Sequence, residues 1–153
     1  MNRETRLAGR RGVTVFLRAI IVWFGILGLA AVNGALRDLV AAPRLGDTVA
    51  RALSTVILCA LILLVTRSTI RWIGPRSARE ALAIGALWFG LTLVFEFGSG
   101  LYAGKTWSVM LEDYDVLRGR LWVLVPVVTF LAPLCARRLE PDPAAAPGAA
   151  RRQ

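Results

Sequence analysis

The sequence predicts an all-α integral membrane protein: a bundle of four spanning helices, with a short amphipathic surface helix between the third and the fourth. The chain has 153 residues, of which 56% are hydrophobic, and its mean hydropathy is +0.59. Soluble domains are only about 45–50% apolar. The apolar residues gather in four long runs, and no run shows the alternation typical of strands in a membrane barrel.

The predicted spans are residues 14–36, 50–66, 78–97 and 121–136. A spanning helix needs about 20 mostly apolar residues, within a range of about 17–25. The first and third runs have this length. The second is short, but Thr48 is a suitable N-cap and Arg51 can extend its side chain to the interface. The fourth is the shortest, and its Pro126 and Pro133 would free backbone carbonyls.

The basic residues predict the orientation. Twelve of the 19 lie before the first run, between the second and third runs, or in the tail, whereas six lie on the other side and Arg18 falls inside the first run. We expect a multi-pass protein of the bacterial inner membrane. Because short cytoplasmic loops carry the excess of Lys and Arg, both termini are predicted to be cytoplasmic and residues 105–118 to lie outside. The first run is longer than the core of a signal peptide, so we expect a retained anchor.

Composition narrows the chemistry. The net charge of +9 follows this topology, and no basic patch interleaves with aromatics, so we expect the lipid bilayer as partner and no nucleic acid. Histidine is absent from the sequence, and Cys59 and Cys135 form no C-x-x-C pair. We therefore expect no metal, no cofactor and no disulfide. The Pro/Ala-rich tail, residues 137–153, is predicted to be disordered and dispensable for folding.

Polar residues gather where the first and third spans end on the outer side. Asn33 and Arg37 are four residues apart and share one face of a continuing helix. Glu96 stands between two phenylalanines, and Gly98-Ser99-Gly100 would stop a helix just after it. Because both ends emerge on the same side, we expect Arg37 and Glu96 to form an ion pair, with Asn33 as a hydrogen-bonding neighbour and Arg120 as the alternative partner.

The segment after Glu96 predicts an amphipathic surface helix over the mouth of the bundle. Its apolar positions recur at three and four: Trp107, Met110, Leu111, Tyr114 and Leu117. Thr106 or Ser108 can cap its start and Gly119 can end it. The candidate outer-face site then comprises Asn33, Arg37, Asp38, Glu96, Trp107, Asp113, Tyr114 and Arg120.

Two sequence motifs are similar to a pattern found in other membrane proteins. N-G-x-L-R-D follows the first run, and F-E-F…W…D-Y…G-R-x-W joins the third to the fourth. The pattern resembles a group of uncharacterised four-span bacterial membrane proteins, and it covers the four-span core but not the tail. That group tends to have Asn after the D-Y pair, where this chain has Asp115. The matching positions are Asn33, Gly34, Leu36, Arg37, Asp38, Phe95, Glu96, Phe97, Trp107, Asp113, Tyr114, Gly119, Arg120 and Trp122. The resemblance directs attention to the outer face and implies no activity.

Three classes of function stay open. In the first, which we favour, the protein is a structural or assembly factor, and Glu96 is a buried clamp between helices. In the second, Glu96 is the titrating carboxylate of a small transporter or channel; four spans are few for such a path, so a homo-oligomer would be needed. In the third, Glu96, Asp113 and Asp115 serve as acid–base groups of a lipid- or envelope-modifying enzyme.

Overall fold

The computed structural model describes residues 3–112 and 121–140, and every element in them is helical. This confirms the all-α class. The elements in chain order are α1 (Arg3–Leu36), the π-helix η1 (Arg37–Ala41), α2 (Ala42–Leu45), α3 (Asp47–Ile73), α4 (Ala78–Tyr102), α5 (Trp107–Glu112) and α6 (Leu124–Arg138).

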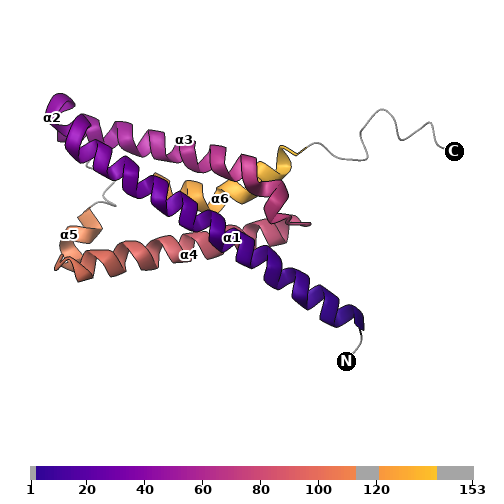
Figure 1. Ribbon diagram of the computed structural model, residues 1–153. Helices are drawn as coiled ribbons and strands as arrows, with labels where there is room; N and C mark the ends of the chain where they lie inside the picture. Colours follow the sequence, from indigo (N-terminus) through magenta and orange to yellow (C-terminus); the bar gives the residue numbers. More distant parts are fainter. Residues whose placement is uncertain (1–2, 113–120, 141–153) are drawn as a thin grey trace, which may run out of the picture.

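Among the described residues, α3, α4 and α6 pack together while α1 crosses α4 obliquely, and α1, α3, α4 and α6 run in alternating directions (Figure 1). Helix α6 packs on both α3 and α4, while α1 packs mainly on α3 and meets α4 over a shorter length. One end of the bundle carries α2 and α5, and we call it the α5 end. At the other end α1 begins, α6 finishes, and α3 turns into α4; we call it the termini end (Figure 1).

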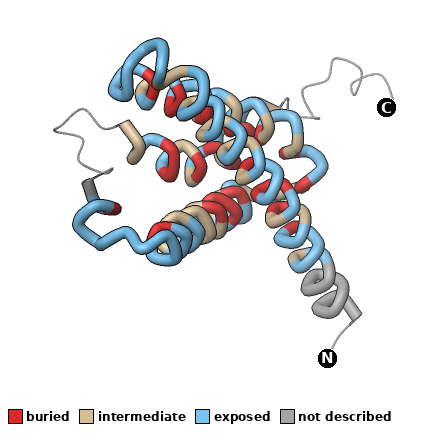
Figure 2. The backbone as a smooth tube through the Cα atoms, turned by 60° about the vertical axis from the view of Figure 1, so that its left-hand side comes forward, coloured by how far each residue is buried: buried red, intermediate tan, exposed pale blue. Residues whose placement is uncertain are grey.

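Among the described residues, three helices are long and apolar enough to cross a membrane: Arg11–Leu45, Asp47–Ile73 and Ala78–Tyr102. Their outward surfaces are apolar, as at Phe24, Leu64 and Val94, which are 61%, 63% and 73% exposed. Figure 2 shows the buried stretches on the sides of the helices that face each other, with exposed residues around the outside. Soluble monomers rarely expose such extensive apolar surface, whereas lipid chains solvate it.

The core lies where α1, α3, α4 and α6 meet, and tryptophan indoles tie α1 to α4 within it. Trp88 is fully buried, and its Nε1 donates to the carbonyl of Ala19 at 2.8 Å. Trp23 Nε1 donates to Thr92 Oγ1 at 3.1 Å. Each indole therefore brings apolar bulk into the core and finds an acceptor on the facing helix.

Helices α4 and α6 approach closely at Gly85. A Cβ built on Gly85 would lie only 2.0 Å from the carbonyl oxygen of Phe130. A small residue at this position therefore lets the two backbones meet, which is how membrane helices commonly pack. Gly25 and Gly28 on α1 have open space where a Cβ would stand, so they serve no such contact with the described residues.

The predicted helix ends differ from the observed ones. Helix α4 continues through Gly98-Ser99-Gly100 to Tyr102, so these residues do not stop it. The chain turns instead at Gly104, whose φ of 74° lies in the left-handed region, and the amide of Lys105 donates to the carbonyl of Gly100. A glycine costs a helix about 1 kcal/mol without forbidding it, while the left-handed turn requires one.

The second predicted span is longer than expected at both ends. Helix α3 begins at Asp47, one residue before Thr48, and its N-cap position is Gly46, without a side-chain cap. It extends seven residues beyond Thr66. Polar side chains there donate hydrogen bonds to backbone carbonyls of the same helix: Ser68 donates to the carbonyl of Leu64, and Thr69 to that of Val65. The apolar run therefore marks the middle of this helix and not its ends.

The start of the predicted tail belongs to the folded bundle. Helix α6 extends to Arg138, and both Leu139 and Glu140 contact α3. The rest of the tail, residues 141–153, lies outside the described residues. The predicted surface helix is described only as α5, because residues 113–120 also lie outside. Within α5, Met110 is buried against Gly100, and Trp107 stacks on Phe97 with ring centroids 5.6 Å apart.

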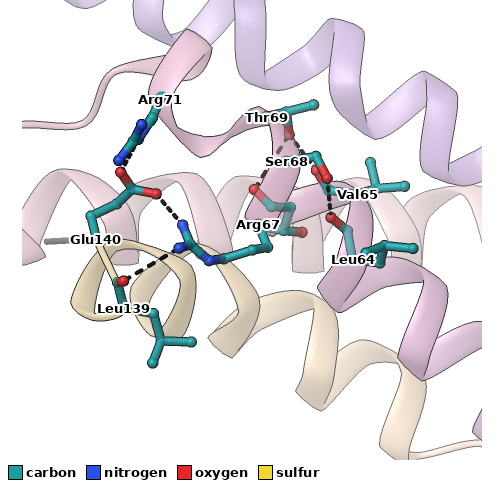
Figure 3. A network of polar contacts seen from close by, with 9 residues as sticks. Leu64, Val65, Arg67, Ser68, Thr69, Arg71, Leu139 and Glu140 are labelled. Atoms are coloured by element: carbon teal, nitrogen blue, oxygen red, sulfur yellow. Dashed lines mark hydrogen bonds and ion pairs between the residues drawn. The ribbon is translucent and has the colours of Figure 1, made fainter.

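Arginines hold the termini end together. Arg18 donates to the carbonyl of Trp72 at 2.8 Å, close to the end of α3. Arg137 donates to the carbonyl of Arg76 at 2.6 Å. Arg67 and Arg71 on α3 both donate to the carboxylate of Glu140 (Figure 3). Guanidinium groups thus satisfy carbonyls that a helix end or a connecting loop leaves without backbone partners.

Candidate functional site

Two adjoining cavities occupy the half of the bundle nearest the α5 end. The larger has a volume of about 920 Å³ and is bordered by charged side chains of η1, α3 and the α4–α5 connection; we call it the polar cavity. The smaller, of about 240 Å³, lies between α1, α3, α4 and the start of α6, and we call it the apolar cavity. Glu96, Ser99 and Trp122 line both, so they form the boundary between the two.

Glu96 and Trp122 are joined across this boundary. The indole Nε1 of Trp122 donates to Oε1 of Glu96, linking α4 to the start of α6. Ser99, one turn further along α4, donates its hydroxyl to the carbonyl of Glu96 at 3.1 Å. The carboxylate is only partly buried, and a carboxylate accepts up to about four hydrogen bonds. Glu96 thus joins α4 to the start of α6 at the boundary between the two cavities.

Arg37 is held by its neighbour Asp38. Its Nε and Nη2 donate to the two carboxylate oxygens of Asp38 at 2.8 and 3.2 Å. This fork-to-fork geometry is the strong form of an arginine–carboxylate pair. Arg37, Asp38 and Glu96 all line the polar cavity, so three predicted site residues share one site. Asp38 is thus one partner of Arg37, and the pairing of Arg37 or Arg120 with Glu96 stays a prediction.

Arg37 and Asp38 are the first two residues of the π-helical turn η1. In a regular α-helix, adjacent residues point about 100° apart. The wider turn of η1 begins at Arg37 and shifts the register of the helix there. Such π-bulges are frequent at functional sites.

The other predicted site residues are elsewhere. Asn33 donates from Nδ2 to Ser54 on α3, to Oγ at 2.7 Å and to the carbonyl at 3.1 Å, and it lines neither cavity. Trp107 stacks on Phe97 and lines neither cavity as well. Asp113, Tyr114 and Arg120 lie outside the described residues. Asn33 thus fastens α1 to α3 beside the site.

Several residues of the polar cavity were not predicted as site residues. They come from the start of α3 and from the turn after α4: Asp47, Thr48, Arg51, Ser99 and Lys105. Asp47 and Arg51 are four residues apart and share a helix face, and this spacing could have indicated from the sequence that both belong to one site. The prediction instead treated Arg51 as an interface anchor and placed the end of α4 too early.

The two cavities differ in electrostatics. The described lining of the polar cavity carries three basic residues, Arg37, Arg51 and Lys105, and three acidic ones, Asp38, Asp47 and Glu96. Along the described wall of the apolar cavity Glu96 alone is charged, and most other lining residues are apolar or aromatic. Within the described part of the chain, no three His, Cys, Asp or Glu side chains are grouped to hold a metal ion.

Comparison of the chain with models of protein families, with curated proteins and with solved structures gives no match. The function of the protein is therefore inferred from the geometry of these two cavities.

Proposed function

We propose that this protein is a four-span membrane protein that acts as a binding or assembly factor without catalysis, and that the joined cavities around Glu96 are its extracytoplasmic binding site. The observation that carries the proposal is the pairing of a 920 Å³ polar cavity with a 240 Å³ apolar one across Glu96 and Trp122. Ligand sites are concave, mostly apolar, and contain a few converging polar groups.

Helix α6 is the fourth span in this proposal. Its 15 residues rise about 22 Å, less than the roughly 30 Å of a bilayer core. Its position supports the assignment, since it packs between α3 and α4, and Val125, Thr129 and Ala132 are buried there. The opposite face of α6 exposes Leu124, Val127 and Leu131, and local thinning of the bilayer can accommodate a short span at modest cost.

The orientation follows from the arginines. The termini end holds Arg67, Arg71, Arg76 and Arg79 as well as the arginines that flank α1 and α6, so the positive-inside rule favours this end as cytoplasmic. The α5 end is then outside. Helix α5, with Trp107 exposed and Met110 buried, is the surface helix over the mouth of the bundle.

The cavities favour a binding site over a purely structural clamp. A clamp that only joins helices fills the space between its partners, because protein interiors pack densely. Here Arg37 and Glu96 border an open volume, and the helices are already joined by Asn33–Ser54 and Trp88–Ala19. The lining is thus available for a ligand or for a segment of another membrane protein.

A transporter is the second candidate, because Glu96 lines an apolar cavity inside the bundle and Pro133 interrupts the hydrogen bonding of α6. Pro126 lies in the first turn, where a helix tolerates proline. A transport path would have to open the arginine contacts at the termini end, and it would need a homo-oligomer.

Cysteine accessibility tests the proposal. In a background with Cys59 and Cys135 changed to Ala, single cysteines replace Ser108 on α5, Ala78 at the start of α4, and Ser99 between the cavities. Intact cells are treated with a small, membrane-impermeant thiol reagent. We expect Ser108→Cys and Ser99→Cys to be labelled and Ala78→Cys to be labelled only after the cells are opened.

The outcomes are separable. Labelling of Ala78→Cys but not Ser108→Cys in intact cells would reverse the orientation and refute an extracytoplasmic site. Labelling of Ser108→Cys without Ser99→Cys would show that the cavity is closed, as the structural clamp requires. Thr129→Cys, at a buried position on the wall of the apolar cavity, is the matched control and should stay unlabelled, because a charged reagent is excluded there.

A further inference from the structure

The polar side chains in the described wall of the apolar cavity form hydrogen bonds within the chain. They are four side chains with oxygen atoms and two indoles: Thr92, Glu96, Ser99, Thr129, Trp23 and Trp122. Thr92 accepts from the Trp23 indole, and Thr129 donates to a carbonyl of its own helix at 2.7 Å. The hydroxyl of Ser99 and the indole of Trp122 both donate to oxygens of Glu96. Since the rest of this wall is apolar, the cavity favours an apolar occupant.

The size of the apolar cavity limits that occupant to a narrow molecule. Its volume is about 240 Å³. An apolar protein cavity of about 150 Å³ holds a benzene molecule. The space therefore accommodates part of one hydrocarbon chain, whereas a helix about 10–12 Å across is too wide for it.

The apolar cavity reaches the outside of the bundle between α1 and α4. Ala31 on α1 and Phe95 on α4 both line it, and both are exposed. The Trp23 and Trp88 indoles join these two helices nearer the termini end, and toward the α5 end the helices separate (Figure 1). A molecule in the bilayer can thus enter sideways, without crossing water.

The depth of this entrance matches acyl chains and not headgroups. Phe95 lies seven residues before Tyr102, where α4 ends. Seven residues of helix rise about 10 Å, while the whole 25-residue helix, at about 37 Å, exceeds the roughly 30 Å bilayer core by only a few ångströms. In the proposed orientation, the entrance therefore opens into the hydrocarbon of the outer leaflet.

We propose that the apolar cavity binds one acyl chain of an outer-leaflet lipid, which enters from the bilayer between α1 and α4. This assignment rests on the proposed binding site and adds the class of ligand.

A photoreactive lipid tests the assignment. The purified full-length protein is reconstituted into phosphatidylcholine vesicles in which a fraction of the lipid carries a diazirine near the end of one acyl chain. After irradiation, the labelled residues are located by mass spectrometry. We expect label on Leu58 and Ile62, which line the cavity and are each only 1% exposed, and on the lipid-facing Phe24. Ile84, buried outside the cavity wall, should stay unlabelled.

Two variants test the path of the chain. Ala30→Phe fills the cavity, and Ala31→Phe obstructs its entrance from an exposed position that tolerates a larger side chain. Excluding two methylene groups weakens burial of a chain about tenfold, so the label on Leu58 and Ile62, relative to Phe24, should fall by about that factor in each variant. Ala60→Phe, on an exposed face of α3, is the matched control and should label as the wild type does.

The contrary results are specific. Label on Phe24 without label on Leu58 and Ile62 would overturn the acyl-chain assignment. Unchanged labelling of Leu58 and Ile62 in Ala31→Phe would refute entry between α1 and α4. A photoreactive phenylalanine analogue placed at Ala31 that crosslinks, in cells, to another protein would identify a protein segment at the entrance and overturn the lipid.

The proposed function has a separate readout. If the acyl-chain assignment fails in a protein whose Ser99→Cys variant is labelled from outside, the extracytoplasmic binding site still stands. Failure of the Ser99 labelling would overturn the proposed function itself.

Discussion

Glu96 and Trp122 are joined at the boundary of the two cavities, so the behaviour of the site depends on what each side chain needs. The indole of Trp122 needs an acceptor, because a buried N–H without one costs about 1–3 kcal/mol. The carboxylate of Glu96 provides that acceptor, and so would an amide. The charge of Glu96 is therefore separable from its role as an acceptor.

Substitutions at Glu96 test this separation. Glu96→Gln keeps an oxygen for the Trp122 indole, so we expect its free energy of unfolding in detergent to equal or exceed that of the wild type. Glu96→Leu strands the indole and should lower it by about 1–3 kcal/mol. Trp122→Phe, combined with Glu96→Leu, should cost less than the sum of the single changes, because the stranded N–H is gone.

The alternative role of Glu96 as a clamp makes the opposite prediction. Glu96→Gln and Arg37→Gln would then each cost about 3–5 kcal/mol, and the double variant would recover part of that loss. A coupling energy that disappears at low pH would identify the clamp. Arg120→Gln is the control, because coupling of Glu96 to Arg120 alone would keep the site and change its pairing.

For individual residues, the sequence predicted which side chains line the polar cavity better than it predicted their hydrogen-bond partners. Arg37, Asp38 and Glu96 share the polar cavity as expected, since each stands where an apolar run ends. Their partners depend on details that periodicity does not contain. Arg37 binds its own neighbour Asp38, and Asn33 lies beside Ser54 because α1 packs on α3.

Among the elements, the contact of α4 with α6 has the least room, since a Cβ on Gly85 would clash with the backbone of Phe130. Gly85→Ala must therefore push α6 away, and overpacking of this kind costs about 1–3 kcal/mol. We expect the free energy of unfolding to fall by that amount, as measured by denaturant titration in detergent micelles.

Gly90→Ala is the matched control on the same helix, because nothing lies within 4 Å of a Cβ there. Alanine is a better helix former than glycine, so this variant should be unchanged or more stable by up to about 1 kcal/mol. Equal losses for the two alanines would mean that the helix itself, and not the contact with α6, requires glycine at both positions.

The existence of the long helices was predictable, whereas their ends were not. Apolar runs located α1, α3, α4 and α6, since each must bury or solvate a hydrophobic surface. The ends depend on smaller energies. Helix α4 passes three residues expected to stop it, and α3 continues over polar residues whose side chains bond back to their own helix. Differences of about 1 kcal/mol per residue decide such boundaries.

Across the whole molecule, the two ends of the bundle are built differently. At the α5 end, charged side chains of the described residues border a cavity. The termini end is closed by guanidinium groups that bind carbonyls and the carboxylate of Glu140 (Figure 3). This contrast fits a protein that offers its ligand site on one side of the membrane and fixes its helices on the other.

Glu140 makes the closure of the termini end testable by pH. The hydrogen bond from Arg71, followed by that from Arg67, holds the pKa of the Glu140 carboxyl below its ordinary value. A carboxyl whose pKa is lower in the folded state stabilises the fold above its unfolded-state pKa, and this contribution is lost as pH falls through the folded-state value. Glu140→Gln should therefore lower the melting temperature at neutral pH, and the difference from wild type should disappear in acid.

Two truncations complete this test, and they divide the predicted tail at the point where the structure does. Removal of residues 141–153 keeps Glu140 and should leave the melting temperature close to that of the full chain. Removal of residues 140–153 takes the carboxylate from Arg67 and Arg71 and should reproduce the loss seen with Glu140→Gln, with the same dependence on pH. If both truncations melt like the full chain at every pH, the ion pairs at Glu140 contribute nothing to stability, as many exposed pairs do not, and the helices at the termini end are then fixed by the Arg18 and Arg137 contacts with backbone carbonyls.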